Sequence, residues 1–352
     1  MIFSLRPKRK VLSMDIGAHK IKIVEGSNTK NGIQINNFLS IETPEGSLRD
    51  GIILDKDLMH YVISEELRNK KIKTKDVYLT INSSKIVTRE IVIPKVEYDE
   101  IDKILKYQIE DYLPINVNDY IIQFKIIEGI NADDIEKLRI LVIAIQKNII
   151  DDYYELVRNL NLNPIVLDYQ PNSISKLLKY NSVVNNTFPL QNLTIASIDI
   201  GYDSTKISII KNGNVLVTKI VEIAGKYIDE SILNLNCNDE NLGEIKNKII
   251  NISHSYDNKS NDENILSILK SAVLIIAEKI EAVFRYYLNR KTDNKINMII
   301  LSGGISNING LDNLFGNIFN IPTININSLD SVWFKGSLIN YANAIGSIIR
   351  EY

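Results

Sequence analysis

Several residue types that mark common protein classes are scarce in this sequence. Its 352 residues include one cysteine, Cys237, so no internal disulfide can form and a reducing compartment such as the cytosol is expected. The three histidines, His19, His60 and His254, lie too far apart in the sequence to suggest a metal site. The chain also lacks the phosphate-loop motif Gly-x-x-x-x-Gly-Lys-Ser/Thr and the nucleophile motif Gly-x-Ser-x-Gly. Two large hydrolase classes are therefore excluded.

Long apolar runs and an excess of one charge are also missing. The longest uncharged stretch, residues 180–198, is interrupted by polar residues and proline, so no membrane span is expected. Lys and Arg total 41 against 43 Asp and Glu, which gives a net charge of -2. With charges so balanced, the protein has no overall positive electrostatic potential that would attract a polyanion, so we expect no nucleic-acid partner.

The first ten residues are basic. Residues 1–10 carry four cations, but the apolar stretch that follows reaches Asp15 before it attains the length of a signal peptide. We therefore expect a cytoplasmic protein. The basic segment is either a solvated tail or is weakly attracted to an anionic lipid surface, at about 1 kcal/mol per basic residue near the headgroups.

The composition is that of a folded protein with more than one domain. Hydrophobic residues make up 45% of the chain and charged residues 24%, which is enough apolar surface to build a core. A chain of this length is expected to form about two domains.

An internal repeat divides the chain into two related halves. Two short apolar segments end in the tripeptide Asp-Ile-Gly, at Asp15 and at Asp199, and a lysine stands seven residues after each aspartate. Each lysine opens a β-branched run that reaches an Asn-Gly pair, at residues 31–32 and 212–213. Asn-Gly between such runs is the strongest short signal for a β-hairpin. Each half is therefore expected to begin with a hairpin in an α/β fold.

Other segments can be assigned coarsely from their periodicity. Helices are expected at 56–70, 149–160, 173–179 and 267–288, and strands at 77–81, 165–167 and 298–301. A separate block, residues 83–146, has the order strand, helix, strand, strand, with an amphipathic helix at 98–112 that ends before Pro114. This block is expected to be an inserted subdomain.

The duplicated Asp-Ile-Gly turn suits phosphate chemistry. Gly17 and Gly201 would let backbone amides face phosphate oxygens, and Asp15 and Asp199 could hold a hydrated divalent cation. A single such turn is more often a plain hairpin turn. Two copies, joined by the late pair Gly303-Gly304, are far more specific.

These residues resemble the actin-like ATPase superfamily, and within it the PilM family of type IV pilus assembly proteins, with the FtsA family as the nearest relative. The similarity extends over nearly the whole chain. Besides the two turns, it rests on the segments 51–55, 93–95, 104–114, 224–228, 301–304 and 341–346. Of these, Tyr107 to Pro114 is the segment most specific to PilM, because it lies outside the shared nucleotide core.

The resemblance implies an actin-like fold of two lobes and a division of the chain among four parts. The first-lobe core would comprise 1–82, 148–190 and 331–352, with an FtsA-type partner-binding insert at 83–147. The second-lobe core would comprise 191–225 and 296–330, with a helical subdomain at 226–295.

The resemblance also implies roles for particular residues in binding ATP and Mg²⁺. The first phosphate loop would contain Asp15 and Gly17, with Ala18 and His19 after them, and the second Asp199, Gly201, Ser204 and Thr205. Both aspartates would hold Mg²⁺ through water. The nucleoside would meet Gly225, Lys246, Gly303 and Gly304. Lys22 and Lys206 would face the phosphates, or point outward as solvated hairpin lysines.

Two positions need separate comment. Ala18 stands where the family usually has a hydroxyl residue, which removes one phosphate contact; His19 would replace it when protonated, or face water. Gln170 stands where actin places a glutamine that orients the attacking water, and it is otherwise a polar linker residue before a helix. We therefore expect ATP hydrolysis to be slow or absent.

The function that the resemblance implies is that of an adaptor. The protein would dock the cytosolic tail of a PilN-like membrane protein and link it to the pilus motor ATPase and the platform protein, being peripheral to the membrane through these partners. The expected docking residues are Ile104, Tyr107, Gln108, Tyr112, Leu113 and Pro114. Two alternatives are an FtsA-like filament-forming membrane adaptor, disfavoured because the chain stops at Tyr352 without a C-terminal amphipathic helix, and a small-molecule kinase of the same superfamily.

Overall fold

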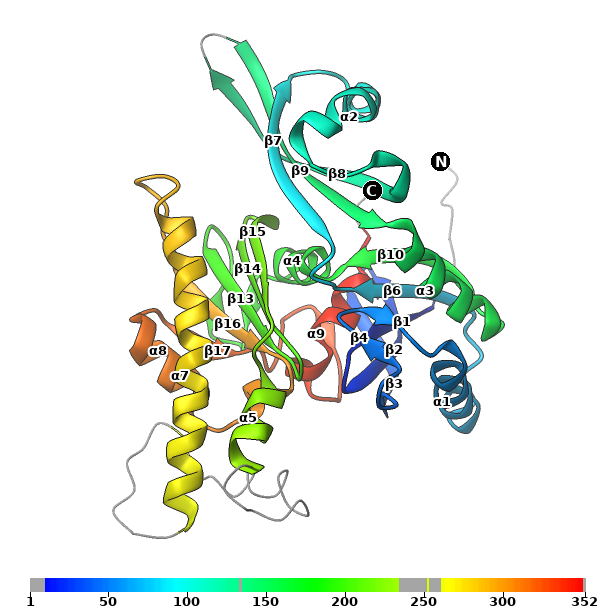
Figure 1. Cartoon of the computed structure of the whole chain (residues 1–352), viewed down its shortest axis with the longest axis vertical. Helices are drawn as coiled ribbons and strands as arrows, with labels where there is room; N and C mark the ends of the chain where they lie inside the picture. The colour runs from blue at the N-terminus through cyan, green and yellow to red at the C-terminus, as the bar shows by residue number, and fades with distance from the viewer. Residues whose placement is uncertain (1–9, 133–134, 234–251, 253–260, 351–352) are drawn as a thin grey trace.

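The computed structural model describes residues 10–132, 135–233, 252 and 261–350. Within them the chain builds two mixed β-sheets with two helices between them, and a small subdomain that projects from one end (Figure 1). Both Asp-Ile-Gly segments begin a sheet, as the sequence predicts.

The first sheet has six strands in the order β10-β6-β1-β2-β3-β18. Its strands are β1 (Val11–Ile16), β2 (Lys20–Thr29), β3 (Gly32–Glu42), β6 (Asp76–Ile81), β10 (Asn163–Tyr169) and β18 (Val332–Trp333). A short hairpin of β4 (Leu48–Arg49) and β5 (Ile52–Ile53) leads into α1 (Lys56–Asn69), and α3 (Lys147–Asn159) precedes β10. The apolar sides of α1 and α3 pack on one face of this sheet, where they meet the alternating β1 residues Leu12, Met14 and Ile16.

The second sheet has five strands in the order β15-β14-β13-β16-β17. Its strands are β13 (Thr194–Ile200), β14 (Thr205–Lys211), β15 (Asn214–Val221), β16 (Met298–Ser302) and β17 (Thr323–Asn325). The two residues between β14 and β15 are Asn212 and Gly213, both with positive φ, as the expected Asn-Gly hairpin requires. The outer face packs against α5 (Gly225–Leu233), α7 (Asn261–Leu288) and α8 (Leu311–Phe319).

Two helices fill the space between the sheets. They are α4 (Gln170–Tyr180) and α9 (Leu338–Ser347), and their core includes residues from both sheets, such as Val11 and Ile195 (Figure 1). The helices cross closely at Gly346, because a methyl group there would lie 2.3 Å from the carbonyl oxygen of Ser173. The inner faces of the two sheets therefore meet at α4 and α9, which makes this layer the place where a shared site can form.

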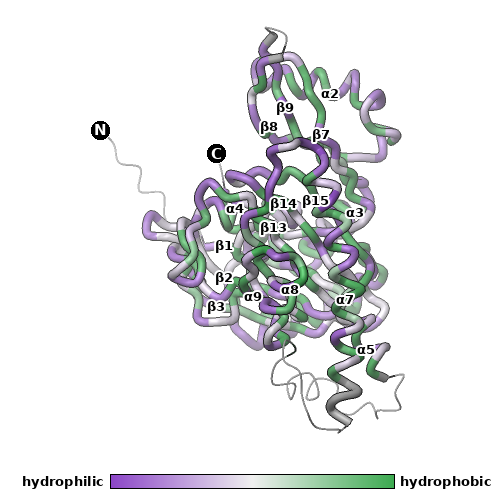
Figure 2. Tube along the Cα trace, turned by 90° about the vertical axis from the view of Figure 1, so that its left-hand side faces the viewer, coloured by the Kyte–Doolittle hydropathy of each residue, from purple (hydrophilic) through white to green (hydrophobic). Residues whose placement is uncertain are grey.

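The projecting subdomain has the predicted order of elements. It contains β7 (Val87–Pro94), α2 (Tyr98–Tyr112), the turn η1 (Val117–Asp119), β8 (Tyr120–Ala132) and β9 (Ile135–Gln146). Its antiparallel sheet has the order β7-β9-β8, and α2 buries Ile101, Leu105 and Ile109 against one face. We call this subdomain the insert. Figure 2 shows it as a separate body beyond the two lobes.

Some helices begin earlier than the periodicity predicts. α4 starts at Gln170 instead of Ser173, because Pro171 fits the first turn of a helix, where no intrahelical N–H is needed. α7 starts at Asn261 instead of Ser267, and α3 at Lys147 instead of Ile149. Residues 183–184 and 188–189 add the small hairpin of β11 (Val183–Val184) and β12 (Phe188–Pro189).

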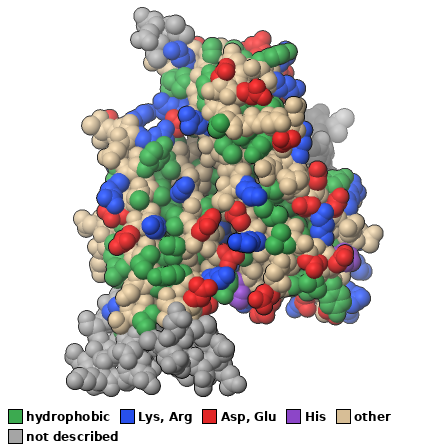
Figure 3. All heavy atoms as spheres, viewed as in Figure 1, with side chains coloured by type: hydrophobic (Ala, Val, Ile, Leu, Met, Phe, Trp, Pro, Cys, Tyr) green, Lys and Arg blue, Asp and Glu red, His purple; other side chains and the backbone are tan. Residues whose placement is uncertain are grey.

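The surface matches the balanced composition. Acidic and basic side chains are interspersed over the face drawn in Figure 3. No helix in the described part of the chain is both long enough and apolar enough to span a membrane.

Candidate functional site

The two Asp-Ile-Gly turns adopt the same backbone geometry in the two lobes. The amide of Gly17 donates to the carbonyl oxygen of Lys20 at 3.2 Å, and the amide of Gly201 donates to that of Ser204 at 3.1 Å. The glycine amides therefore close the two hairpins, and the amides that can face a ligand are those of the residues that follow them. The amides of Ala18 and His19 and of Tyr202 and Asp203 make no hydrogen bond within the described residues. These amides are the ones available to an anion.

Strand alternation places both aspartates on the inner faces of their sheets. On β1, Leu12 and Met14 pack toward α1 and α3, so Asp15 points to the other face, toward α9. On β13, Ile198 and Ile200 pack toward α7, so Asp199 also points inward. Asp15 and Asp199 therefore face each other across the ends of α4 and α9.

The carboxylate of Asp199 is held by side chains from three elements. Asn343 of α9 donates from Nδ2 to Oδ2 at 2.7 Å, and Gln170 of α4 donates from Nε2 to the same oxygen at 3.2 Å. The Nζ of Lys206 lies 4.0 Å from it. Gln170 thus lies in the site, buried at the start of α4 and not in a linker.

The two lysines of the repeat lie opposite the two aspartates. Lys22 is the β2 partner of Asp15, and Lys206 is the β14 partner of Asp199. Residues directly opposite on antiparallel strands share a face of the sheet. The alternative of two solvated lysines therefore does not hold, because both charges act on the inward-facing carboxylates.

The two carboxylates have opposite pKa shifts. Burial raises the pKa of Asp15 above its ordinary value; Lys22 and Lys206 oppose this, and the charge of Asp199 adds to it. Burial also acts to raise the pKa of Asp199, but Lys206, Lys22 and the Asn343 hydrogen bond outweigh it, so that pKa is lowered. Asp199 is thus the firmly ionised member of the pair, and Asp15 is the member that gains most from a nearby cation.

The late glycine pair lies beside Asp199. Gly303 has φ 92°, and a methyl group on it would lie 2.4 Å from Asp199 Oδ1, so only glycine fits this position. Gly304, the first residue of η3 (Gly304–Asn307), is exposed, and a methyl group on it would meet nothing within 4 Å. Gly303 therefore shapes the site, while Gly304 leaves space next to it.

The other predicted ligand residues differ in how accessible they are. The Thr205 hydroxyl is buried and donates to the Ile223 carbonyl oxygen, whereas Ser204 is partly exposed at the turn. Gly225 is buried, and a methyl group on it would lie 2.7 Å from Ile305 Cδ1. Lys246 lies outside the described residues.

The two loops touch at their tips. The ring of His19 stacks on the ring of Tyr202, with centroids 4.6 Å apart and planes inclined by 25°. His19 comes from the first lobe and Tyr202 from the second, so this contact joins the lobes directly. His19 is exposed but packs on an aromatic ring.

The residues present fit a hydrated Mg²⁺ ion with a phosphate chain. Gln170 Oε1 is buried without a hydrogen-bond partner, and the two carboxylates and the free loop amides surround the same region. No group of three or more His, Cys, Asp and Glu side chains converges among the described residues. Two carboxylates suit a Mg²⁺ ion that keeps most of its waters. Asp15 and Asp199 would hold it through water, and the ion would neutralise phosphate charge.

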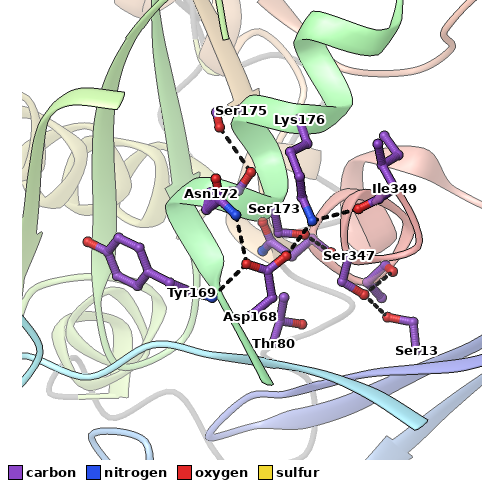
Figure 4. Close-up of polar contacts among 12 residues, drawn as sticks. Ser13, Thr80, Asp168, Tyr169, Asn172, Ser173, Ser175, Lys176, Ser347 and Ile349 are labelled. Atoms are coloured by element: carbon purple, nitrogen blue, oxygen red, sulfur yellow. Dashed lines mark hydrogen bonds and ion pairs between the residues drawn. The ribbon is translucent and has the colours of Figure 1, made fainter. Parts of the chain in front are cut away.

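A buried polar network holds the two central helices together below the site. Lys176 of α4 donates to Asp168 Oδ2 at 2.5 Å and to the carbonyl oxygen of Ile349 at 2.7 Å (Figure 4). Asp168 Oδ1 accepts from the Tyr169 amide and from Asn172. Every charge is therefore paired, as a buried ion pair requires. Figure 4 also shows the Ser13 hydroxyl, from β1, beside that of Ser347 on α9.

The insert residues predicted to bind a partner fall into two groups. Tyr107 is 88% exposed, and Gln108 and Pro114 are exposed as well. Leu113 is buried in the insert core, and Ile104 and Tyr112 are partly buried against it. Only the first group is fully available to a partner.

The insert also touches the second lobe. Glu90 of β7 accepts from Arg290, which follows α7, at 2.8 Å. Lys125 of β8 donates to the carbonyl oxygen of Gly213 at 3.1 Å, and Asn214 donates to that of Ile127 at 2.9 Å. The insert, although it interrupts the first half of the sequence, is therefore attached to both lobes.

Comparison with known families agrees with this architecture. The model of the family described as type IV pilus assembly protein PilM matches residues 13–341. The chain belongs to the PilM family. Its fold is that of the actin-like ATPases, as the sequence predicts.

Individual relatives are distant in sequence. A solved "PilM-PilN type IV pilus biogenesis complex" contains a chain that is 19% identical with a TM-score of 0.77, over 97% of this chain and 98% of that one. MreB5 of Spiroplasma citri bound to ADP is 14% identical, with a TM-score of 0.53 over 96% and 94% of the two chains. The cell division protein FtsA of Staphylococcus epidermidis is 22% identical over 73% of this chain, which spans 58% of the length of that relative.

Three residues of this PilM-family site are not among those predicted. Asn343 binds Asp199, Tyr202 stacks on His19, and Arg290 joins the second lobe to the insert. Asn343 stands in the segment 341–346, which contributes to the family resemblance. That resemblance is the sequence feature that could have indicated Asn343 as a site residue. Tyr202 directly follows Gly201 in the second loop.

Proposed function

We propose that this PilM-family protein is a cytoplasmic ATP-binding adaptor of the type IV pilus assembly platform. The observation that carries the proposal is the symmetric pair of turns, in which Asp15 with Lys22 and Asp199 with Lys206 face each other between the lobes. The loop amides of both lobes would hold the phosphates. Mg²⁺ would supply charge neutralisation, and Gly304 leaves room for the nucleoside.

The insert is the proposed docking surface for the cytosolic tail of a PilN-like membrane protein. Among the described residues β8 pairs with β9 on one side only, so the backbone groups of its other edge, apart from the Ile127 carbonyl that accepts from Asn214, can pair with an added strand. Apolar side chains remain exposed close to that edge: Tyr98 is 61% exposed and packs against Phe124 of β8, and Ile121 is 40% exposed. Tyr107 adds an exposed aromatic ring on α2.

Nucleotide and partner would then influence each other through the lobes. The insert contacts the second lobe at Glu90 with Arg290 and at Lys125 with Gly213. A change in lobe closure that moves the second lobe must strain or release these contacts. We propose that the adaptor transmits this coupling to the pilus motor ATPase and the platform protein.

Calorimetry with a synthetic peptide tests the adaptor. The peptide is the cytosolic tail of a PilN-like membrane protein, titrated with and without ATP and Mg²⁺. We expect binding whose affinity changes with ATP, and weaker binding by Tyr107→Ala. The matched control is Tyr61→Ala, which removes another exposed tyrosine, 61% exposed, from α1. If the peptide does not bind, the docking surface is wrong; if it binds equally with and without ATP, the coupling is wrong.

A further inference from the structure

A basic pocket lies on the first lobe, where α1, α3 and the start of β6 meet. Its cavity measures about 390 Å³. Its apolar lining is formed by Leu67, Ile72, Leu160 and Leu162, and four exposed cations surround it, namely Arg68, Lys71, Lys73 and Lys75. Ser64 and Thr74 complete the lining, which contains no carboxylate.

The four cations have no structural task inside the protein. Within the described part of the chain none of their side chains forms an ion pair or a hydrogen bond. Nor are they needed to complete the end of α1, because the last carbonyl groups of that helix accept from the backbone amides of Lys70, Lys71 and Ile72. Four like charges gathered around one cavity repel each other, and an anion would relieve that repulsion.

The N-terminal basic segment enters the fold at the same place. β1 runs parallel to β6 with Leu12 level with Val77, so the two strands begin at the same edge of the sheet, next to Lys75. Residues 1–10, which carry four further cations, are joined to this end of the sheet. Figure 1 places α1, α3 and β6 together on one side of the molecule.

We propose that this basic pocket binds the phosphate headgroups of anionic phospholipids and holds this side of the protein against a membrane. The cations at the rim of the pocket can bind the phosphate of a phospholipid, and the apolar side chains that line the pocket can contact its hydrocarbon part. Inorganic phosphate would use the cations but not the four apolar side chains. The proposal does not rest on nucleotide or peptide binding.

Vesicle sedimentation with the full chain tests the proposal. Vesicles of phosphatidylglycerol mixed with phosphatidylcholine are compared with phosphatidylcholine alone, for the parent and for the triple variant Lys71→Gln/Lys73→Gln/Lys75→Gln. A control variant, Lys279→Gln/Lys291→Gln/Lys295→Gln, removes the same charge from exposed positions on the second lobe. We expect the pocket variant to lose at least about tenfold in affinity for the anionic vesicles, since each lysine near the headgroups contributes severalfold. Raised salt should reduce binding of the parent.

The outcomes separate the pocket from simpler sources of attraction. Equal loss in both variants, or no loss in either, would overturn the assignment, since it would show a general charge effect or binding through the N-terminal segment alone. A second measurement uses soluble ligands: short-chain phosphatidylglycerol should bind more tightly than glycerol phosphate. Equal binding of the two, tight binding of inorganic phosphate without vesicle binding, or equal binding of an acidic peptide would each overturn the lipid assignment.

Discussion

Asn343 donates a hydrogen bond of 2.7 Å from Nδ2 to Asp199 Oδ2, and thereby ties α9 to the end of β13. The same side chain also acts weakly against the burial that raises the pKa of Asp15, so it acts on carboxylates from both lobes. α9 packs between the sheets and touches α4 closely at Gly346. A shift of either lobe relative to α9 therefore changes the surroundings of both carboxylates.

The first prediction concerns Asn343. Asn343→Ala should weaken Mg²⁺-dependent ATP binding by about tenfold, because a hydrogen bond to a charged group contributes roughly 1.5–3 kcal/mol. Titration of a fluorescent ATP analogue measures the affinity. The matched control is Asn340→Ala on the same helix, whose side chain bonds Ser337 and Asn307 instead. Equal affinity of the two variants would show that Asn343 does not position the ligand-binding carboxylates.

The second prediction is that two isosteric substitutions change stability in opposite directions. The raised pKa of Asp15 means that its ionisation costs stability as pH rises above about 4, where the unfolded carboxyl ionises. Asp15→Asn should therefore raise the Tm of the nucleotide-free protein at neutral pH. The lowered pKa of Asp199 means that its ionisation adds stability above that pH, so Asp199→Asn should lower the Tm.

Thermal melts from acidic to neutral pH check this pair. Both differences from the parent should shrink toward zero as the pH falls and the carboxyls become protonated in the folded and the unfolded chain. A Tm difference for Asp15→Asn that is independent of pH would mean that packing, and not ionisation, is responsible. Asp293→Ala, at an exposed loop position, should leave the curve unchanged. Both site variants should bind Mg²⁺ and ATP more weakly than this control.

The sequence correctly predicted those parts of the fold that depend on residues close together in the chain. The hairpins followed from Asp-Ile-Gly and Asn-Gly, and α2 followed from its periodicity and from Pro114. The direction of Lys22 was left open, because alternation alone does not say which face is inside. The answer lies in the tight turn at Gly17, which sets the register that places Lys22 opposite Asp15.

The site residues that were missed depend on long-range packing. Asn343 lies 144 residues after Asp199, and only the insertion of α9 between the sheets brings them together. The ion pair of Glu90 with Arg290 spans 200 residues and joins an insert in the first half to the second lobe. A turn motif predicts the conformation of its own backbone, but it does not predict which distant residues will contact it.

The third prediction is slow hydrolysis of bound ATP. Gln170 lies beside Asp199, but the lowered pKa of that carboxyl makes it a weak general base, and Ala18 offers no hydroxyl to the phosphates. Phosphate release should therefore be far slower than the roughly 1–100 s⁻¹ of kinases. Gln170→Ala should slow this residual rate further and change ATP affinity little. Turnover in the kinase range that Gln170→Ala abolishes would favour an enzyme over an adaptor.

The last prediction concerns the contact through which insert and second lobe communicate. Glu90 accepts from Arg290 at 2.8 Å and lies 3.3 Å from Arg139 Nε, whereas Glu128 pairs with Arg139 and, in the described part of the chain, with no other cation. Glu90→Ala should leave the affinity for a PilN-like peptide without ATP nearly unchanged but reduce the change that ATP causes. Coupling of this kind typically amounts to 5–150-fold in affinity.

Glu128→Ala, which removes an Arg139 partner within the insert, should keep the full effect of ATP. A double-mutant cycle with Arg290→Ala then isolates the pair, because Glu90→Ala should change nothing further once Arg290 is gone. If Glu90→Ala and Glu128→Ala reduce the ATP effect equally, the coupling does not pass through the contact with the second lobe, and the rigidity of the insert itself would carry it.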